Sequence, residues 1–238
     1  MPQLRRMSDG SDTTASAEHA SAARFGVLVL LALCLVCWLL VAPGSEKLAL
    51  IGALAWALPI ISAAGWAARD RRWHRGAGLG AAVLAVIAGW VAVEVSLTLG
   101  RIVASIVLII VGVIVPVIVV KALRRRGGVD AQMLAGAVSI YLLVGIAFAM
   151  AYTIVAVATH EPLFATATGA VDGSFSDRVY FSFITLSTTG YGDFTPVNGV
   201  ARSLAILEAI GGQLYLVTAV ATIVSLLAAK LPGSRSEG

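Results

Sequence analysis

Six consecutive residues near the C-terminal end of the chain, positions 188–193, read TTGYGD, and their backbone could bind a cation. In an extended strand, successive carbonyl groups point to opposite sides, so alternate residues need positive φ if all carbonyls are to face one axis. Glycine adopts positive φ at little cost, and Gly190 and Gly192 have the required spacing of two. Stacked rings of carbonyl oxygens can replace the water shell of a potassium ion. We therefore expect these carbonyls to bind dehydrated K⁺, with the Thr188 hydroxyl as a further oxygen at the inner end.

The same geometry forces the side chains of Thr189 and Tyr191 away from the axis. Non-helical backbone at membrane depth is costly unless it is buried in protein or lines a polar path. The preceding residues 177–187 can enter a membrane as a re-entrant helix but are too few to cross it. One chain supplies one strand, and closing a path around an axis requires several copies. We therefore expect a cyclic homo-oligomer that transports K⁺ and needs no cofactor.

The composition places the chain in a membrane. Hydrophobic residues make up 59% of the 238 residues, charged residues only 13%, and the mean hydropathy is +0.92. A soluble domain carries about 25% charged residues, so this chain could not cover a water-facing surface. A soluble enzyme, a nucleic-acid-binding domain and a disordered chain are therefore excluded.

Six apolar segments approach or exceed the roughly 20 residues that a membrane-spanning helix needs. They predict an all-α membrane protein with six transmembrane helices, in which the re-entrant helix and the TTGYGD loop lie between the fifth and the sixth. The predicted spans are residues 25–42, 48–68, 77–99, 102–120, 131–158 and 203–229.

Lys and Arg indicate the orientation, because cytoplasmic loops carry an excess of these residues. With the N-terminus inside, most of the 17 Lys and Arg residues fall in inner segments, and both termini are cytoplasmic. We expect a multi-pass protein of the plasma membrane, with an N-terminal tail at residues 1–24 and a short tail at residues 231–238. The basic inner loops are expected to attract anionic lipid, and nucleic acid is not needed as a partner to explain them.

From the fifth span to the end of the sixth, the chain resembles the tetrameric potassium channel superfamily, whose filter reads T-V-G-Y-G or T-T-G-Y-G followed by Asp. The resemblance implies a homotetramer around a central pore, with residues 188–192 of the four subunits as the selectivity filter. It also implies that Tyr180 and Phe181 of the pore helix pack around Tyr191. Asp193 then takes the acidic position just outside the filter, where the Tyr180 hydroxyl could bond to it.

The resemblance to the six-span voltage-gated members fails in the fourth span. That plan needs Arg or Lys at every third position, and residues 102–120 contain neither. We therefore expect a four-helix transmembrane domain at residues 25–126 without voltage-sensor arginines, followed by a pore domain at residues 127–230. Such a channel is not intrinsically voltage-gated.

The sixth span contains Gly211 and Gly212. By its distance from Asp193, Gly212 matches the hinge glycine of the family's inner helix, whereas close packing is the usual role of glycine in membrane helices. A gating hinge and a packing contact both remain open for this pair. Farther along, three apolar residues recur every four positions: Leu216, Val220 and Val224. They could line an inner gate or pack on a neighbouring subunit.

Glu208 lies one turn before Gly212 inside the apolar sixth span. An intramembrane carboxylate is expensive and normally has a partner. Its level predicts a place at the base of the pore helix, supporting the filter, where Thr185, Ser187 or Thr188 would donate hydrogen bonds to it. A cavity-facing position, from which it would attract cations, is the alternative.

The expected function is passive, potassium-selective conduction across the membrane, and no nucleophile–base set or metal-ligand cluster supports an enzyme. Three alternatives stay open. One is a weakly selective cation channel, and another is a channel whose first four helices sense a ligand, lipid or partner. The third is an active potassium transporter, although related transporters usually carry four filter-like loops in one chain and this chain has one.

Overall fold

The computed structural model describes residues 26–40, 55–57, 59–63, 97–124 and 131–228. Four labelled helices are α4 (Leu97–Arg124), α5 (Ala131–Thr159), α6 (Phe175–Leu186) and α7 (Gly199–Ala228). Three short strands flank α6, namely β1 (Phe164–Thr166), β2 (Gly169–Val171) and β3 (Thr195–Pro196). A further apolar helix spans Gly26–Leu40.

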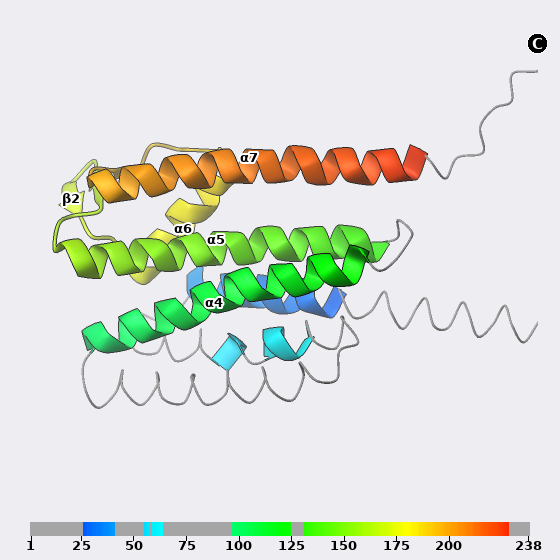
Figure 1. Ribbon diagram of the computed structural model, residues 1–238. Helices are drawn as coiled ribbons and strands as arrows, with labels where there is room; N and C mark the ends of the chain where they lie inside the picture. The colour runs from blue at the N-terminus through cyan, green and yellow to red at the C-terminus, as the bar shows by residue number, and fades with distance from the viewer. Residues whose placement is uncertain (1–25, 41–54, 58, 64–96, 125–130, 229–238) are drawn as a thin grey trace, which may run out of the picture.

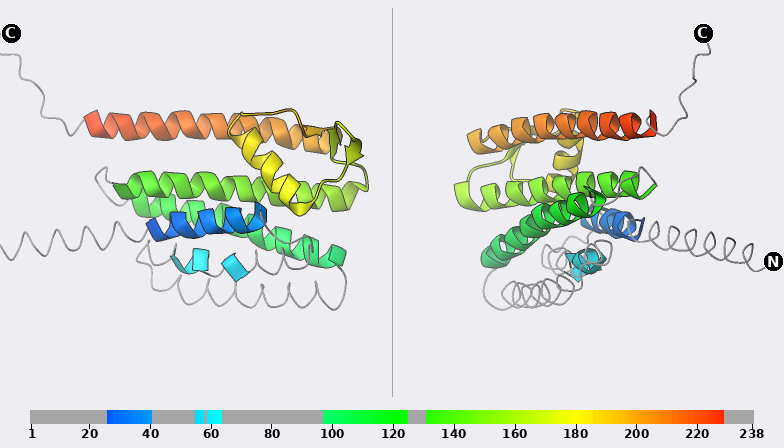
Figure 2. Two further views of the ribbon diagram at one scale, coloured as in Figure 1. Left: turned by 180° about the vertical axis from the view of Figure 1, so that it is seen from behind. Right: turned by 45° about the vertical axis from the view of Figure 1, so that its right-hand side comes forward.

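Helix α5 is the central element of the described structure. Helix α4 packs against one side of α5, whereas α6 and α7 contact it elsewhere (Figure 1). Figure 2 shows from behind that α6 crosses obliquely between α5 and α7. The short helix α6 is therefore held between two long ones.

Apolar side chains from several helices share one core around α4 and α5. Leu28 and Leu35 of the Gly26–Leu40 helix belong to this core and are fully or almost fully buried. Helices α4 and α5 approach closely at Gly112, where an added Cβ would lie 2.7 Å from the Cβ of Ala147. Small residues at such crossings let helix backbones pack tightly in a membrane.

Three described helices are long and apolar enough to cross a membrane, namely Thr98–Lys121, Met133–Thr159 and Gly199–Ser225. They coincide with the fourth, fifth and sixth predicted spans, so the prediction of apolar helices of membrane-spanning length is confirmed for this part of the chain. The helix Gly26–Leu40 lies within the first predicted span. Most of the second predicted span and nearly all of the third lie outside the described residues.

The predicted break between the third and fourth spans, at Gly100 and Arg101, is wrong. Helix α4 is continuous from Leu97, and Arg101 lies half-buried within it. A glycine inside a helix costs only about 1 kcal/mol relative to alanine, which is too little to end the helix here. The long arginine side chain can also bury its stem while its charge reaches a polar surface.

A small antiparallel sheet departs from the all-α expectation. The strand order is β2-β1-β3, so the strand that follows the TTGYGD segment pairs with the strand that follows α5. Each strand has only two or three residues, which is too short for a periodic sequence pattern to reveal. The sheet anchors the outer end of the candidate filter.

Helix α6 begins with a capping box. The backbone N–H of Asp177 donates to the Ser174 hydroxyl at 3.2 Å, and the backbone N–H of Ser174 donates to the Asp177 carboxylate at 2.7 Å. This reciprocal pair satisfies two N–H groups at the helix start. The helix confirms the short helix predicted at residues 177–187 and begins two residues earlier.

Candidate ion-conducting site

The C-terminal end of α6 holds the start of the TTGYGD segment. The backbone N–H of Thr188 donates to the carbonyl of Thr185 at 2.9 Å. The N–H groups of Thr189 and Gly190 both donate to the carbonyl of Ile184, at 2.9 and 3.1 Å. These bonds satisfy carbonyls that a helix end otherwise leaves without partners. They also turn the N–H groups of the segment toward α6, so that the helix positions its backbone.

Positive φ recurs at alternate positions of the segment. Thr188 has φ 56°, Gly190 has φ 53° and Gly192 has φ 80°. The expectation of positive φ at both glycines is confirmed. For Thr188, whose side chain carries a Cβ, the left-handed conformation costs on the order of 1–2 kcal/mol. The contacts around Thr188 must therefore hold it at positive φ, a conformation that threonine does not favour by itself.

The carbonyl oxygens of residues 188–192 are available for a cation. Within the described part of the chain, no N–H or hydroxyl group donates to any of them, and all five residues are exposed. Peptide carbonyls are strong acceptors, and exposed ones can bind either water or a cation. The φ angle of the segment alternates in sign, and five carbonyl oxygens have no protein partner among the described residues. Oxygens of this kind can replace the hydration shell of K⁺.

The Thr189 side chain is held on the α6 side of the segment. The hydroxyls of Thr189 and Ser187 lie 2.9 Å apart, and Ser187 donates to the carbonyl of Phe183 at 2.7 Å. A hydroxyl has one proton, so Thr189 is the donor in its bond with Ser187. This chain of bonds fastens the second filter residue to the last turn of α6.

The outer end of the segment is held through Asp193. The Tyr180 hydroxyl of α6 donates to the Asp193 carboxylate at 2.8 Å, as the resemblance implied. The backbone N–H of Phe194 donates to the other carboxylate oxygen at 3.1 Å. The hydrogen bond to Asp193 raises the pKa of the Tyr180 hydroxyl above its usual value. The ring of Phe194 then packs edge-on against Phe164 of β1, with centroids 5.6 Å apart.

The packing of Phe181 around Tyr191, which the resemblance implied, is not present in the chain. Phe181 is buried, with its ring centroid 4.7 Å from that of Phe164 and 5.2 Å from that of Tyr152. Adjacent helix residues point about 100° apart, since a turn holds 3.6 residues, and here Tyr180 reaches Asp193 while Phe181 packs on Tyr152 and Phe164. No ring of the described residues contacts Tyr191, which is 72% exposed.

Glu208 joins three helices at one buried carboxylate. Its Oε2 accepts a 2.8 Å hydrogen bond from the Tyr152 hydroxyl of α5, and its Oε1 accepts one from the Ser182 hydroxyl of α6. Glu208 and Tyr152 are fully buried. The carboxylate therefore faces α5 and α6. Of the two sequence alternatives, this agrees with a structural hydrogen-bond acceptor beside the pore helix and not with a cavity-facing position.

The partners predicted for Glu208 are nevertheless wrong: Thr185, Ser187 and Thr188. Gly212 of α7 lies against the carbonyl of Leu186 at the end of α6, and Glu208 bonds to Ser182 one turn earlier in both helices. The residue four positions before Gly212 therefore meets the residue four positions before Leu186, which is Ser182. Glu208 lies one turn farther from the filter than the sequence indicated.

Gly212 and Gly211 face different surroundings within the unbroken helix α7. A Cβ added to Gly212 would lie 2.5 Å from the carbonyl oxygen of Leu186 and 2.9 Å from its Cδ1. A Cβ added to Gly211 would meet nothing within 4 Å. Gly212 is thus required for close packing of α7 on α6, while its role as a hinge remains a prediction.

The inner half of α7 presents a bare apolar face. Leu216 is 37% exposed, Val220 is 56% exposed and Val224 is 58% exposed. Other large apolar side chains of α7 are also exposed: Val200, Ile206, Leu207, Ile210, Leu214 and Val217. A role of the first three in an inner gate stays a prediction.

Two polar residues on the helices that support the candidate filter were missed by sequence reasoning. Gln213 of α7 donates from Nε2 to the Thr188 hydroxyl at 2.8 Å. Arg178 of α6 is only 3% exposed, and it donates to the carbonyl of Gly173 at 2.9 Å and to the Thr153 hydroxyl at 3.4 Å. A lone polar residue inside an apolar span is the signal that could have singled out Gln213.

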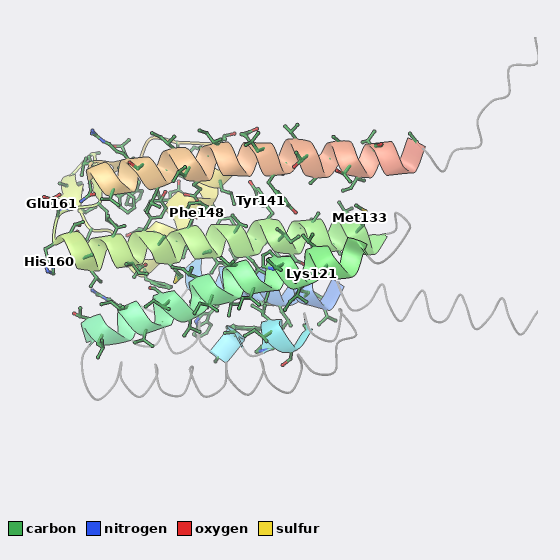
Figure 3. The ribbon with its side chains drawn as sticks, viewed as in Figure 1. Lys121, Met133, Tyr141, Phe148, His160 and Glu161 are labelled. Carbon is green, nitrogen blue, oxygen red and sulfur yellow. The ribbon has the colours of Figure 1, made fainter. Side chains whose placement is uncertain are left out.

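Figure 3 shows the arrangement along α5, the helix that carries much of this support. Tyr141 and Phe148 lie between α5 and α7, whereas His160 and Glu161 mark the end of the molecule at which the sheet lies. The Tyr141 ring stacks on Tyr215 of α7, with centroids 6.1 Å apart. The two long helices are therefore joined by an aromatic contact in addition to the bond between Tyr152 and Glu208.

Comparison with known proteins identifies the same part of the chain. Residues 140–229, which include part of α5, all of α6, the TTGYGD segment and α7, match the family described as ion channel. An 83-residue stretch is 40% identical to Protein LctB of Bacillus caldotenax and covers 34% of this chain and 60% of that protein. A 51-residue stretch is 43% identical to the inward rectifier potassium channel Kirbac3.1 of Paramagnetospirillum magnetotacticum and covers 21% of this chain and 17% of that protein. No solved structure matches the chain significantly.

These matches confirm the resemblance to the potassium channel superfamily that the TTGYGD segment indicated. The chain spans less than two thirds of the length of either relative. The family match begins within α5, so α4 and the residues before it have no counterpart in the matched segment.

Proposed function

We propose that this protein is the subunit of a homotetrameric, potassium-selective channel that conducts K⁺ passively across the plasma membrane. The observation that carries the proposal is the backbone of residues 188–192, whose φ alternates and whose five carbonyl oxygens have no donor within the described chain. The proposed pore domain comprises residues 127–230. This domain forms a pore, so K⁺ is the transported ion and no cofactor or catalytic group takes part.

Incomplete burial supports the tetramer. One chain supplies one filter strand, and Tyr191 in that strand is 72% exposed. The apolar face of α7 is also uncovered within the described chain, where lipid tails or neighbouring copies can pack against it. Four copies around an axis would cover part of this face and bring the filter carbonyls into rings.

Conduction follows from the chemistry of such rings. K⁺ loses its water shell to the carbonyl oxygens and to the Thr188 hydroxyl, and ions in neighbouring sites repel one another so that none stays bound. The C-terminal end of α6 carries the negative end of the helix dipole, which favours a cation beyond it. Attraction of a cation by the helix dipole and coordination by the carbonyl oxygens together support passive conduction as the function.

The proposed channel has no voltage sensor of its own. Helix α4 has no charged residue between Arg101 and Lys121, so the middle of the span holds no charge that a membrane potential could move. Residues 25–126 could then sense a ligand, a lipid or a partner protein instead of voltage.

Reconstitution in K⁺-loaded vesicles tests the function. We expect K⁺ efflux down its gradient without an energy source, and a reversal potential close to that of K⁺ when Na⁺ is outside. Reversal potentials near zero would instead support a weakly selective cation channel. A requirement for ATP or for an ion gradient as driving force would support an active transporter.

A further inference from the structure

Gln213 of α7 contacts the first residue of the candidate filter. It directly follows Gly212, whose lack of a side chain lets α7 approach the carbonyl of Leu186. From there its carboxamide reaches the next segment of the chain, and Nε2 donates to the Thr188 hydroxyl at 2.8 Å. The bond connects the inner helix directly to the innermost residue of the filter.

The bonding capacity of the Thr188 hydroxyl shows what this contact does. A threonine hydroxyl has one proton and two lone pairs. The proton is directed to the carbonyl of Ser187, 2.7 Å away, and one lone pair accepts from Gln213. One lone pair remains, so the two bonds together fix the direction in which the hydroxyl oxygen can accept a further ligand.

We infer that Gln213 is a positioning residue for the innermost cation site of the filter and acts through the Thr188 hydroxyl. This inference rests on the proposed function. The carboxamide suits the task because it donates a hydrogen bond without bringing a charge to the pore. Without it, only the bond to the Ser187 carbonyl restrains the hydroxyl. Two lone pairs are then open instead of one, so the direction in which the oxygen accepts a cation is less well defined.

Cation binding to the purified full-length protein tests this role. The probes are K⁺ and Ba²⁺, because Ba²⁺ has nearly the radius of K⁺ and twice its charge and therefore depends more strongly on oriented oxygens. Calorimetric titrations would compare the wild type with Gln213→Leu, Thr188→Ala and the double variant. Gln213→Asn is the matched control, since it keeps the amide but is one methylene too short to reach Thr188.

We expect Gln213→Leu and Gln213→Asn to weaken Ba²⁺ binding to a similar extent, by roughly three- to tenfold, which is the range that one net hydrogen bond provides. In the Thr188→Ala background, Gln213→Leu should cause no further loss. Equal losses in both backgrounds, or full affinity in Gln213→Asn, would show that Gln213 does not act through the Thr188 hydroxyl.

The same titrations separate this inference from the proposed function. If the wild type binds neither K⁺ nor Ba²⁺, the potassium-channel proposal fails and the inference fails with it. If the wild type binds both and conducts K⁺ selectively, but the Gln213 variants match it, only the positioning role is overturned. Size-exclusion profiles would verify that each variant keeps the assembly of the wild type.

Discussion

The hydroxyl of Tyr152 donates a 2.8 Å hydrogen bond to Glu208, although 56 residues separate the two in the chain. The other carboxylate oxygen accepts from Ser182, so α5, α6 and α7 meet at one buried acidic group. Ser182 also lies 2.7 Å from the carbonyl of Gly145. Its single proton cannot serve two acceptors, and this fact determines how the cluster responds to substitution.

Glu208→Gln should leave the fold close to its original stability. The introduced amide can accept from Tyr152 with its oxygen and donate to Ser182 with its nitrogen, which frees the Ser182 proton for the carbonyl of Gly145. Glu208→Leu leaves the buried Tyr152 hydroxyl without a partner, at a cost of about 1–3 kcal/mol. Thermal melting of the detergent-solubilised protein should therefore rank wild type and Glu208→Gln together, above Glu208→Leu.

Tyr152→Phe provides the matched control for that series. It removes the donor and leaves Glu208 with Ser182, so we expect a melting temperature between those of wild type and Glu208→Leu. Combining Tyr152→Phe with Glu208→Leu should then cost less than the sum of the two single changes, because both remove the same bond. Additive losses would argue against the cluster.

Gly190→Ala should abolish selective K⁺ flux. Nothing lies within 4 Å of the added Cβ, so crowding within the chain is not the cause. The cause is φ of 53°, which costs an alanine about 1–2 kcal/mol and favours rotation of the peptide out of the alternating pattern.

Gly169→Ala is the control for backbone strain without a filter defect. Gly169 has φ of 122° and open space around its Cβ position, but it lies in the hairpin strand β2. That variant should lose some stability and keep its K⁺ over Na⁺ permeability ratio. A Gly190→Ala protein with the wild-type ratio would contradict the assignment of the filter.

The bond between Tyr180 and Asp193 predicts an alkaline limit to filter stability. The phenol must be protonated to donate, and the bond raises its pKa above the usual value. The stabilisation is therefore fully present below the ordinary tyrosine pKa of about 10 and is lost as pH rises through the raised value. Sustained K⁺ flux in vesicles should be steady from neutral pH to about 10 and decline above it.

Tyr180→Phe isolates this contribution. It removes the hydroxyl and keeps the ring, so flux at neutral pH should become less sustained and the additional alkaline decline should disappear. A decline that is identical in wild type and Tyr180→Phe would assign it to another group.

Conductance should depend only weakly on voltage. Moving one elementary charge through 100 mV contributes about 2.3 kcal/mol, which would change an opening equilibrium by well over tenfold. Since residues 102–120 of α4 carry no charge, we expect less than about a threefold change over that range in purified, reconstituted protein. A steep conductance–voltage curve with several gating charges per subunit would refute this.

The sequence was sufficient wherever a local rule decides the structure. Apolar length predicted the fifth and sixth spans, and glycine spacing predicted positive φ at Gly190 and Gly192. It could not supply the register between α6 and α7, because that register depends on the contact of Gly212 with Leu186, and an error of one turn gave Glu208 the wrong partners.

The sheet and the polar contacts of the filter escaped prediction for related reasons. Strands of two or three residues carry no period. Whether Arg178 is buried and whether Gln213 reaches Thr188 depend on which elements the fold brings beside them.

Gly212→Ala and Gly211→Ala form a matched pair that separates packing from bending in α7. Alanine at position 212 would place its Cβ 2.5 Å from the Leu186 carbonyl, and overpacking of this kind typically costs about 1–3 kcal/mol. Alanine at position 211 meets nothing within 4 Å of the chain, and it improves helix propensity. We therefore expect Gly212→Ala to melt at a lower temperature and to disturb K⁺ flux, because α6 must shift together with the filter.

Gly211→Ala should melt at or above the wild-type temperature. If both variants instead melt like the wild type and both reduce the open probability of single channels, bending at the glycine pair outweighs packing, and the close contact with Leu186 is not what the second glycine is needed for.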